Sequence, residues 1–199
     1  MRDKLVLDLY QIGAIKLGEF TLKTGATSPV YIDLRQIISY PDILRAVSRI
    51  IWDTVSLCSF DLICGIPYTA LPIATCIALE NNLPMIMRRK EKKDYGTKQR
   101  IEGAYKAGQS CLLVEDVITS GNSVIETAID LEAAGLVVYD VAVLLDRESN
   151  GKKNLMARNY IVHSVFTLSE VLRILAKSPL LNQKEYDIVQ QLLNETHAS

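Results

Sequence analysis

Two adjacent carboxylates, Glu115 and Asp116, follow an apolar run and precede a loop of small polar residues. The stretch LLVEDVITSGNSV (residues 112–124) predicts a buried strand that ends at the acids, then a turn, then a helix. Backbone N–H groups of such a turn and of a helix N-terminus bind phosphate, and Gly121 lets the backbone approach closely. Ionised carboxylates only accept hydrogen bonds, which suits the vicinal hydroxyls of a ribose. The pattern therefore predicts a sugar-phosphate site.

Other interpretations of this stretch have less support. The two acids could simply cap and solvate the end of a strand, without any ligand. Nucleoside triphosphate and dinucleotide sites are disfavoured, because the chain contains neither GxxxxGK followed by Ser or Thr nor GxGxxG.

The elements that must position these groups alternate along the middle of the chain. The predicted strands are short apolar segments at 61–66, 84–90, 111–116 and 137–147, and the predicted helices are periodic segments at 70–80 and 123–135. Strands that alternate with helices indicate βαβ units and a mainly parallel sheet, and their nearly continuous apolar runs indicate helices on both faces. Ligands bind such sheets outside the carboxyl ends of the strands, where the two acids are expected.

The two ends of the chain carry further elements. Helical spacing over 3–17 predicts an amphipathic helix that ends near Gly18. The remaining expected elements are strands at 20–22 and 30–34, a helix from Pro41, a strand at 160–168 and two C-terminal helices. The basic stretch at 88–103 lacks apolar periodicity and is expected to be a functional or mobile loop, with a merely solvated charge run as the alternative.

The composition is that of an ordinary soluble globular protein: 199 residues, 49% hydrophobic, 23% charged and a net charge of −1. With so little net charge, we expect no general attraction to nucleic acid or to an anionic membrane. Neither a membrane span nor a secretory signal is recognisable, so we expect a cytoplasmic protein. Because the sequence shows no repeats, low-complexity tract or linker, we expect a single domain.

The cysteines Cys58, Cys64, Cys76 and Cys111 are scattered and form no CxxC pair, which indicates a reduced intracellular protein. Because only two histidines accompany them, we expect no structural zinc site. His163 lies in a predicted apolar strand and is expected to be a hydrogen-bonded core residue.

The motif at 112–123 closely resembles the phosphoribosyl-diphosphate (PRPP) motif of type I phosphoribosyltransferases. Four more blocks resemble orotate phosphoribosyltransferase, in particular the N-terminal half of UMP synthase: FTLKTGATSPVYIDLR (20–35), CGIPYTALPIA (64–74), RRKEKKDYGTK (88–98) and LLDRE (144–148). The blocks stand in the expected order, between about Leu17 and about His163. They imply the α/β fold of that family, a mainly parallel sheet flanked by helices, with a small hood from the N-terminal segment. We therefore expect hood elements at about 1–40, a PRPP-binding core at about 41–170 and C-terminal helices at about 168–195.

The resemblance also implies roles for individual residues. The PRPP motif would comprise Glu115, Asp116, Val117, Ile118, Thr119, Ser120, Gly121, Asn122 and Ser123, with the acids on the ribose hydroxyls and the loop on the 5′-phosphate. Further contacts to the phosphates of PRPP would come from Tyr68, Thr69, Arg89, Lys90, Lys93 and Tyr95. Orotate would be bound by Lys23, Tyr31, Ile32, Thr119 and Arg147, the arginine facing its carboxylate. Lys93 and Asp116 would act in catalysis.

The implied reaction converts PRPP and orotate to orotidine 5′-monophosphate (OMP) and pyrophosphate, in de novo pyrimidine biosynthesis. Mg²⁺ is the implied cofactor, held by PRPP and water. The family also implies a homodimer in which Lys93 reaches the neighbouring active site. An OMP decarboxylase is the implied partner, either separate or fused in a UMP synthase of which this chain is one domain. Bacterial relatives often have lysine at the position of Thr69 and histidine at that of Tyr95, so neither residue is assigned a cationic or proton-transfer role here.

Two other functions stay open. The first is transfer to another base, such as uracil or a purine, although a buried Arg147 would be costly opposite a neutral base. The second is a PRPP-binding regulator without catalysis. Such a regulator usually carries a basic nucleic-acid face or a DNA-binding domain, and neither is recognisable in the sequence.

Overall fold

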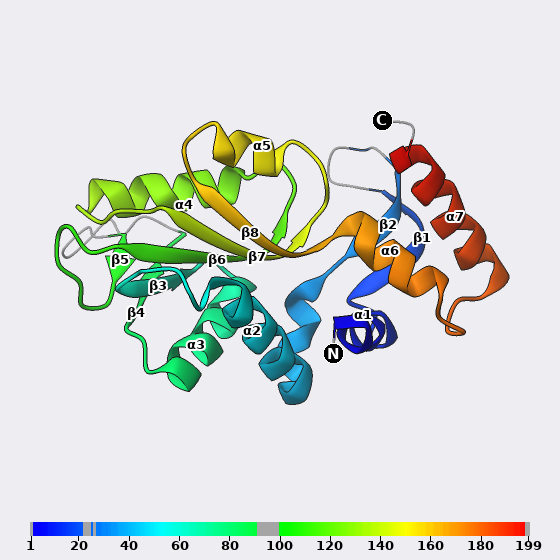
Figure 1. Ribbon diagram of the computed structural model, residues 1–199, viewed down its shortest axis with the longest axis horizontal. Coiled ribbons are helices and arrows are strands. Elements are labelled where there is room, and N and C mark those ends of the chain that lie inside the picture. The colour runs from blue at the N-terminus through cyan, green and yellow to red at the C-terminus, as the bar shows by residue number, and fades with distance from the viewer. Residues whose placement is uncertain (1, 22–24, 26, 91–99, 198–199) are drawn as a thin grey trace. The chain divides into compact units, whose positions relative to one another are not determined.

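The computed structural model describes residues 2–21, 25, 27–90 and 100–197 (Figure 1). Two compact units divide the chain: one consists of Met1–Ile43 and Thr167–Ser199, the other of Leu44–Phe166. Within the described ranges, no helix combines the length and the apolar character needed to cross a membrane.

A six-stranded sheet forms the centre of the larger unit, in the order β5-β4-β3-β6-β7-β8. Its strands are β3 (Leu62–Gly65), β4 (Met85–Arg88), β5 (Ile101–Glu102), β6 (Cys111–Ile118), β7 (Asp140–Asp146) and β8 (Ile161–Thr167). β3 is parallel to β4 and β6, and β6 is parallel to β7, whereas the short β5 runs antiparallel to β4. The predicted mainly parallel sheet is confirmed.

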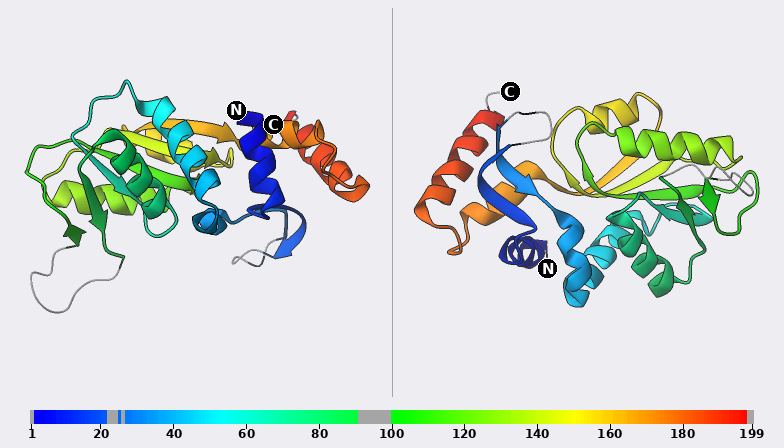
Figure 2. Two further views of the ribbon diagram at one scale, coloured as in Figure 1. Left: turned by 90° about the horizontal axis from the view of Figure 1, so that it is seen from below. Right: turned by 180° about the vertical axis from the view of Figure 1, so that it is seen from behind.

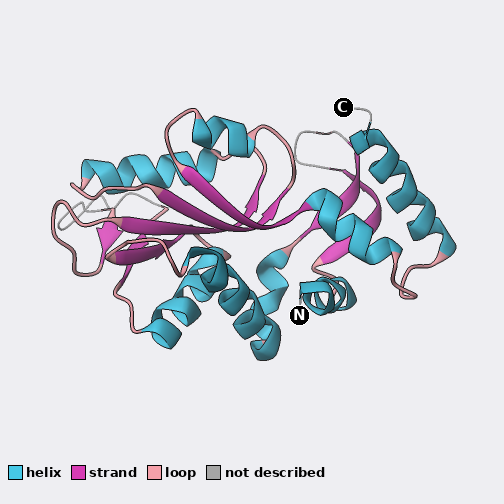
Figure 3. Cartoon of the chain, viewed as in Figure 1, coloured by secondary structure: helices cyan, strands magenta, loops and turns pink. Residues whose placement is uncertain are grey.

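Helices cover both faces of this sheet. On one face lie α2 (Pro41–Val55) and α3 (Ala70–Asn81), and on the other α4 (Asn122–Ala133) and α5 (Gly151–Met156) (Figure 1, Figure 3). The view from behind shows the same layers (Figure 2). All four residues of β3 and six of the seven in β7 are buried, which explains their continuous apolar sequences. Leu113, Leu131 and Val143 are fully buried in the core between the sheet and α4.

Gly65, the last residue of β3, allows α3 to begin close to the strand. A side chain at this position would place its Cβ 2.5 Å from the carbonyl oxygen of Ala70 and 2.9 Å from the Cβ of Ala74. The turn between β3 and α3 is therefore held against the end of the sheet, where ligands bind in this class of fold.

The smaller unit contains a two-stranded antiparallel sheet and helices from both ends of the chain. Its elements are α1 (Arg2–Gln11), β1 (Ile15–Thr21), β2 (Thr27–Ile32), a 3-10 helix (Leu34–Ser39), α6 (Leu168–Ala176) and α7 (Gln183–His197). A capping box begins α6: the Thr167 side chain accepts a hydrogen bond from the Glu170 N–H, and the Glu170 carboxylate accepts one from the Thr167 N–H. α6 packs against α1 and α7.

The predicted N-terminal helix is wrong in its second half, because α1 ends at Gln11 and β1 begins at Ile15. Gly13 has a φ of +74°, and its N–H donates to the carbonyl of Tyr10, which closes the helix. The apolar spacing that fits a longer helix comes from β1, where Ile15 and Leu17 are buried on one face of the strand.

Candidate active site

The predicted site residues of the larger unit lie at one edge of its sheet. β4, β3, β6 and β7 are parallel neighbours, so their carboxyl ends meet at the same edge. Just beyond these ends come Arg89 and Lys90, Tyr68 and Thr69, the loop of residues 119–121, and Arg147. The backbone N–H of Arg147 donates to the Ile118 carbonyl at 3.1 Å, which ties the end of β7 to the end of β6.

Glu115 and Asp116 lie inside β6, so the prediction that the strand ends at these acids is wrong. The pairing with β7 continues to Ile118 opposite Asp146. Glu115 is only 7% exposed, and its carboxylate accepts a hydrogen bond from the Asp116 N–H at 3.0 Å. Burial, followed by the interaction with Asp116, raises the pKa of Glu115 well above its usual value. Glu115 therefore takes up a proton at a higher pH than an isolated glutamate.

The loop after β6 presents polar groups to solvent. Its exposed residues are Thr119, Ser120, Asn122 and Ser123. Gly121 precedes α4 and has a φ of +79°, a conformation that favours glycine. Glycine has no side chain to cap the helix, and the Asn122 N–H donates to the Ser120 hydroxyl at 3.4 Å. The N–H groups that follow in the first turn suit an anion. Val117 is partly exposed, whereas the Ile118 side chain is 1% exposed in the core, so only its backbone can face a ligand.

Residues 149–154, which the sequence pattern did not indicate as part of the site, hold this loop in place. The hydroxyl of Ser149 donates to the Thr119 carbonyl at 2.6 Å, and the side-chain amide of Asn154 donates to the Ser120 carbonyl at 3.0 Å. Both residues belong to the region of α5, which was not predicted because a helix of six residues carries little periodicity. The turn-forming residues Ser149 and Asn150 before Gly151 were the available signal.

Gly151 gives the closest approach between α5 and the loop, and its replacement is expected to displace the loop. In Gly151→Ala the new Cβ would lie 2.6 Å from the Thr119 carbonyl oxygen and 2.8 Å from Ile118 Cγ2. If this loop binds the 5′-phosphate of PRPP, as the sequence predicts, we expect the KM for PRPP to rise about 10-fold, because a small displacement of positioning groups is costly. Steady-state kinetics with Lys152→Ala as the control checks this, since Lys152 is exposed. An unchanged KM in Gly151→Ala would contradict it.

Arg147 places a half-buried guanidinium at the end of β7. Burial lowers the pKa of Arg147 from its ordinary value. Among the described residues, no side chain or backbone group forms an ion pair or hydrogen bond with its guanidinium. A desolvated cation without a protein partner is energetically costly, so its retention at this edge indicates a site for an anionic ligand.

A basic pocket of about 430 Å³ lies beside the ends of β3 and β4. Its lining includes Tyr68, Arg89, Lys90 and Glu102. The Lys90 ammonium lies 5.5 Å from the centre of the Tyr68 ring, and Arg89 Nη1 donates to Glu102 Oε1 at 2.8 Å. The Pro67–Tyr68 peptide bond is cis, and the neighbouring Thr69 is the N-cap residue before α3 and is partly exposed. The two cations make this pocket suitable for phosphate groups.

Two arginines that flank residues 91–99 share one carboxylate of α4. Arg88 Nε donates to Asp130 Oδ2 at 2.6 Å, and Arg100 Nη1 donates to the same oxygen at 2.7 Å. Burial alone would raise the pKa of Asp130, but the hydrogen bonds from Arg100 and Arg88 hold the pKa below its usual value. Asp130 thereby holds both described flanks of the basic stretch against α4, the helix that follows the loop of residues 119–121.

Asp130→Ala is expected to lower the free energy of unfolding by about 3 kcal/mol, because it leaves the buried Arg88 without its carboxylate. Denaturant unfolding at neutral pH measures this. The control is Glu126→Ala on the same helix, whose carboxylate is 66% exposed and 3.9 Å from Arg88, with an expected loss below about 0.5 kcal/mol. Since the pKa of Asp130 is lowered on folding, its contribution is present above about pH 4 and is lost as the pH falls further. A constant difference down to pH 3 would contradict this.

The remaining predicted site residues belong to the smaller unit or lie outside the described residues. Tyr31 and Ile32 are partly exposed on β2 of the smaller unit, where the Tyr31 ring packs 5.5 Å from the ring of Phe20. Lys23, Lys93 and Tyr95 lie outside the described residues.

Comparison with known proteins agrees with this geometry. Residues 33–168 match the phosphoribosyl transferase domain. An orotate phosphoribosyltransferase of Chlamydia caviae is 41% identical over 195 residues, covering 97% of this chain and 95% of that protein. The chain belongs to the orotate phosphoribosyltransferase family. The similarity to a full-length relative decides this, because the domain match identifies only the wider group of phosphoribosyl transferases.

Two further members of this family extend the comparison. The uridine 5′-monophosphate synthase of Bos taurus is 50% identical over 193 residues, which cover 96% of this chain but 40% of that protein. The chain thus spans about two fifths of the length of this relative. The orotate phosphoribosyltransferase of Aeropyrum pernix superposes with a TM-score of 0.78 at 28% identity, over 87% of this chain and 99% of that one. The predicted fold of the family is confirmed, whereas the roles of individual site residues stay predictions.

Proposed function

We propose that this chain transfers the 5-phosphoribosyl group from PRPP to orotate, giving OMP and pyrophosphate. The observation that carries the proposal is the half-buried Arg147, which is unpaired within the described part of the chain and lies at the same sheet edge as the phosphate loop. Orotate is a carboxylated pyrimidine, and a guanidinium binds a carboxylate through two parallel hydrogen bonds. Membership of the orotate phosphoribosyltransferase family supports the same substrate.

The other groups at this edge suit the remaining parts of the reaction. In this proposal the exposed loop residues bind the 5′-phosphate, and Glu115 and Asp116 bind the ribose hydroxyls. The bond from the anomeric carbon to pyrophosphate breaks with its electrons on the pyrophosphate, a bond to ring nitrogen N1 of orotate forms, and the proton of that nitrogen passes to water. Positive charge grows on the ribose near Asp116, and negative charge grows on the pyrophosphate, for which Arg89 and Lys90 are the nearby described cations.

Mg²⁺ is proposed as the cofactor, because this ion prefers phosphate oxygens and water to an all-protein site. The exposed polar loop after β6 and the partly exposed Asp116 suit such a hydrated ion, which PRPP and water would hold. When bound, it would neutralise charge on the departing pyrophosphate. Loss of turnover with EDTA and its return with added Mg²⁺ would support this part of the proposal.

The proposal extends to the oligomeric state of the enzyme, its location in the cell and its partner enzyme. The enzyme would be a cytoplasmic homodimer in which Lys93 acts in the neighbouring subunit's site, and an OMP decarboxylase would consume the product. The much greater length of the UMP synthase relative supports the link to a decarboxylase. Mixing the impaired Lys93→Ala and Asp116→Asn proteins tests the shared site, because subunit exchange would restore one intact site. No recovery after verified exchange would contradict it.

The deciding experiment follows the ultraviolet absorbance of orotate with PRPP and Mg²⁺, beside parallel samples with uracil or hypoxanthine. We expect turnover of orotate only, dependent on all three components. Turnover of uracil or hypoxanthine instead would assign a different base. If no base is turned over but PRPP still binds in calorimetry, the protein is a PRPP-binding regulator and not an enzyme.

A further inference from the structure

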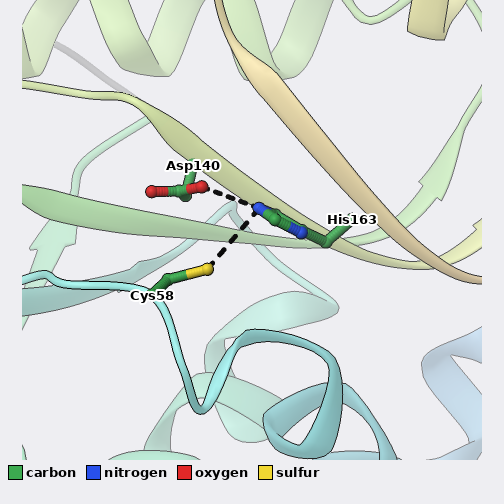
Figure 4. Close-up of side chains that lie close together, drawn as sticks. All are labelled: Cys58, Asp140 and His163. Carbon is green, nitrogen blue, oxygen red and sulfur yellow. Dashed lines mark hydrogen bonds and ion pairs between the residues drawn. The ribbon is translucent and has the colours of Figure 1, made fainter.

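In the larger unit, a thiol and a carboxylate converge on one nitrogen of an imidazole (Figure 4). Cys58 lies in the turn after α2, Asp140 is the first residue of β7, and His163 lies on β8. His163 Nε2 is 2.7 Å from Asp140 Oδ1 and 3.7 Å from Cys58 Sγ. One donor atom from each residue lies within 4.8 Å of the other two, and all three residues are partly exposed.

This cluster is separate from the candidate active site. Cys58 lies before β3 and Asp140 begins β7, so both stand at the amino ends of parallel strands. The loop of residues 119–121 and Arg147 follow the carboxyl ends of β6 and β7, at the opposite edge of the sheet. The cluster therefore takes no part in the reaction proposed above.

The geometry excludes a nucleophilic thiol of the Cys–His–Asp kind. Such a triad requires the thiol at one ring nitrogen of the histidine and the carboxylate at the other. Here the thiol and the carboxylate both approach Nε2. Burial and the neighbouring Asp140 raise the pKa of Cys58, which disfavours the thiolate unless a cation is bound.

The distances suit a borderline divalent ion. A tetrahedral Zn²⁺ has bonds of about 2.3 Å to sulfur and about 2.0–2.2 Å to nitrogen and oxygen, so its ligand atoms stand roughly 3.3–3.6 Å apart. The observed 3.7 Å between Cys58 Sγ and His163 Nε2 is close to that spacing. The 2.7 Å hydrogen bond between His163 and Asp140 must open by only about 0.6 Å, which a side-chain rotation provides. Sulfur, imidazole and carboxylate ligands together favour Zn²⁺ over Mg²⁺.

Contrary to the expectation from the sequence that there is no structural zinc site, we propose that Cys58, Asp140 and His163 form a three-ligand site for Zn²⁺, with water as the fourth ligand. The ion would join the turn before β3 to β7 and β8. It would therefore stabilise the larger unit without touching the PRPP site.

The test uses tag-free protein, freed of metal by chelation and kept reduced, with Co²⁺ as the spectroscopic probe. We expect one equivalent of Co²⁺ to produce the thiolate-to-cobalt charge-transfer band and the visible bands of tetrahedral cobalt, and Zn²⁺ to displace both. In Cys58→Ser the charge-transfer band should disappear. Calorimetry should show Zn²⁺ affinity lowered about 100-fold in Cys58→Ser and in His163→Gln.

Two controls separate this site from other metal-binding groups. Cys76→Ser changes another partly buried cysteine, on α3, and should retain the full cobalt spectrum. Asp140→Asn can still hydrogen-bond His163, so it should preserve the fold while weakening Zn²⁺ binding. Zn²⁺ should also raise the thermal unfolding temperature of the unmodified protein but not of Cys58→Ser. The proposal is overturned if the unmodified protein gives no charge-transfer band, or if Cys58→Ser keeps it.

Discussion

Asp116→Asn is expected to lower kcat for OMP formation about 100-fold, the size of effect seen when a group that stabilises transition-state charge is removed. The ribose carbon becomes cationic as pyrophosphate leaves, and a carboxylate stabilises that charge whereas a neutral amide does not. The amide keeps the size and much of the hydrogen-bonding capacity of the side chain, so PRPP should still bind. Initial rates at saturating substrates, with calorimetry for PRPP, measure the two quantities separately.

The stability of Asp116→Asn distinguishes this expectation from a folding defect. The interaction with Asp116 raises the pKa of the buried Glu115, so removing the charge relieves repulsion between the two carboxylates. We expect the unfolding temperature to be unchanged or slightly higher. Asp53→Asn, the same change on the exposed surface of α2, is the matched control and should retain full activity. A kcat within twofold of the unmodified enzyme would contradict the role of Asp116.

Arg147→Ala is expected to raise the KM for orotate at least about 30-fold and to leave the KM for PRPP nearly unchanged. Losing a hydrogen-bonded partner of a desolvated charge costs about 2–5 kcal/mol. Arg147→Lys should be nearly as damaging, because an ammonium lacks the two parallel donors of a guanidinium. Discrimination between orotate and uracil should fall in both variants, which competition assays can measure.

Arg147→Ala should not destabilise the free protein, which separates a ligand-binding role from a structural one. The guanidinium is half-buried without a partner among the residues described, so its removal relieves a desolvation cost. We expect an equal or higher unfolding temperature, and Arg158→Ala on the exposed surface should change neither stability nor kinetics. If Arg147→Ala unfolds more easily and binds orotate normally, the residue is structural.

Local patterns predicted most of the larger unit. The helix expected at 70–80 is observed as Ala70–Asn81, and the one expected at 123–135 as Asn122–Ala133. These elements are long enough for their apolar periodicity to be distinctive, and turn residues mark their ends. β5 and α5 were not predicted, because they are too short to show a distinctive apolar periodicity. At the N-terminus, the spacing of apolar residues continues from α1 into β1, so the spacing did not reveal that the helix ends before Gly13.

By itself, the sequence determined that a buried strand leads through a polar turn into a helix and that the chain resembles orotate phosphoribosyltransferases; it predicted that this turn binds phosphate. Only the tertiary structure decided which distant residues meet: Ser149, Gly151 and Asn154 beside the loop, Arg88 and Arg100 on Asp130, and Cys58 with His163, which are 105 positions apart. The physical reason is the range of the interactions. Helix periodicity and turn preference depend on neighbours within a few residues, whereas these contacts depend on the order and register of the strands.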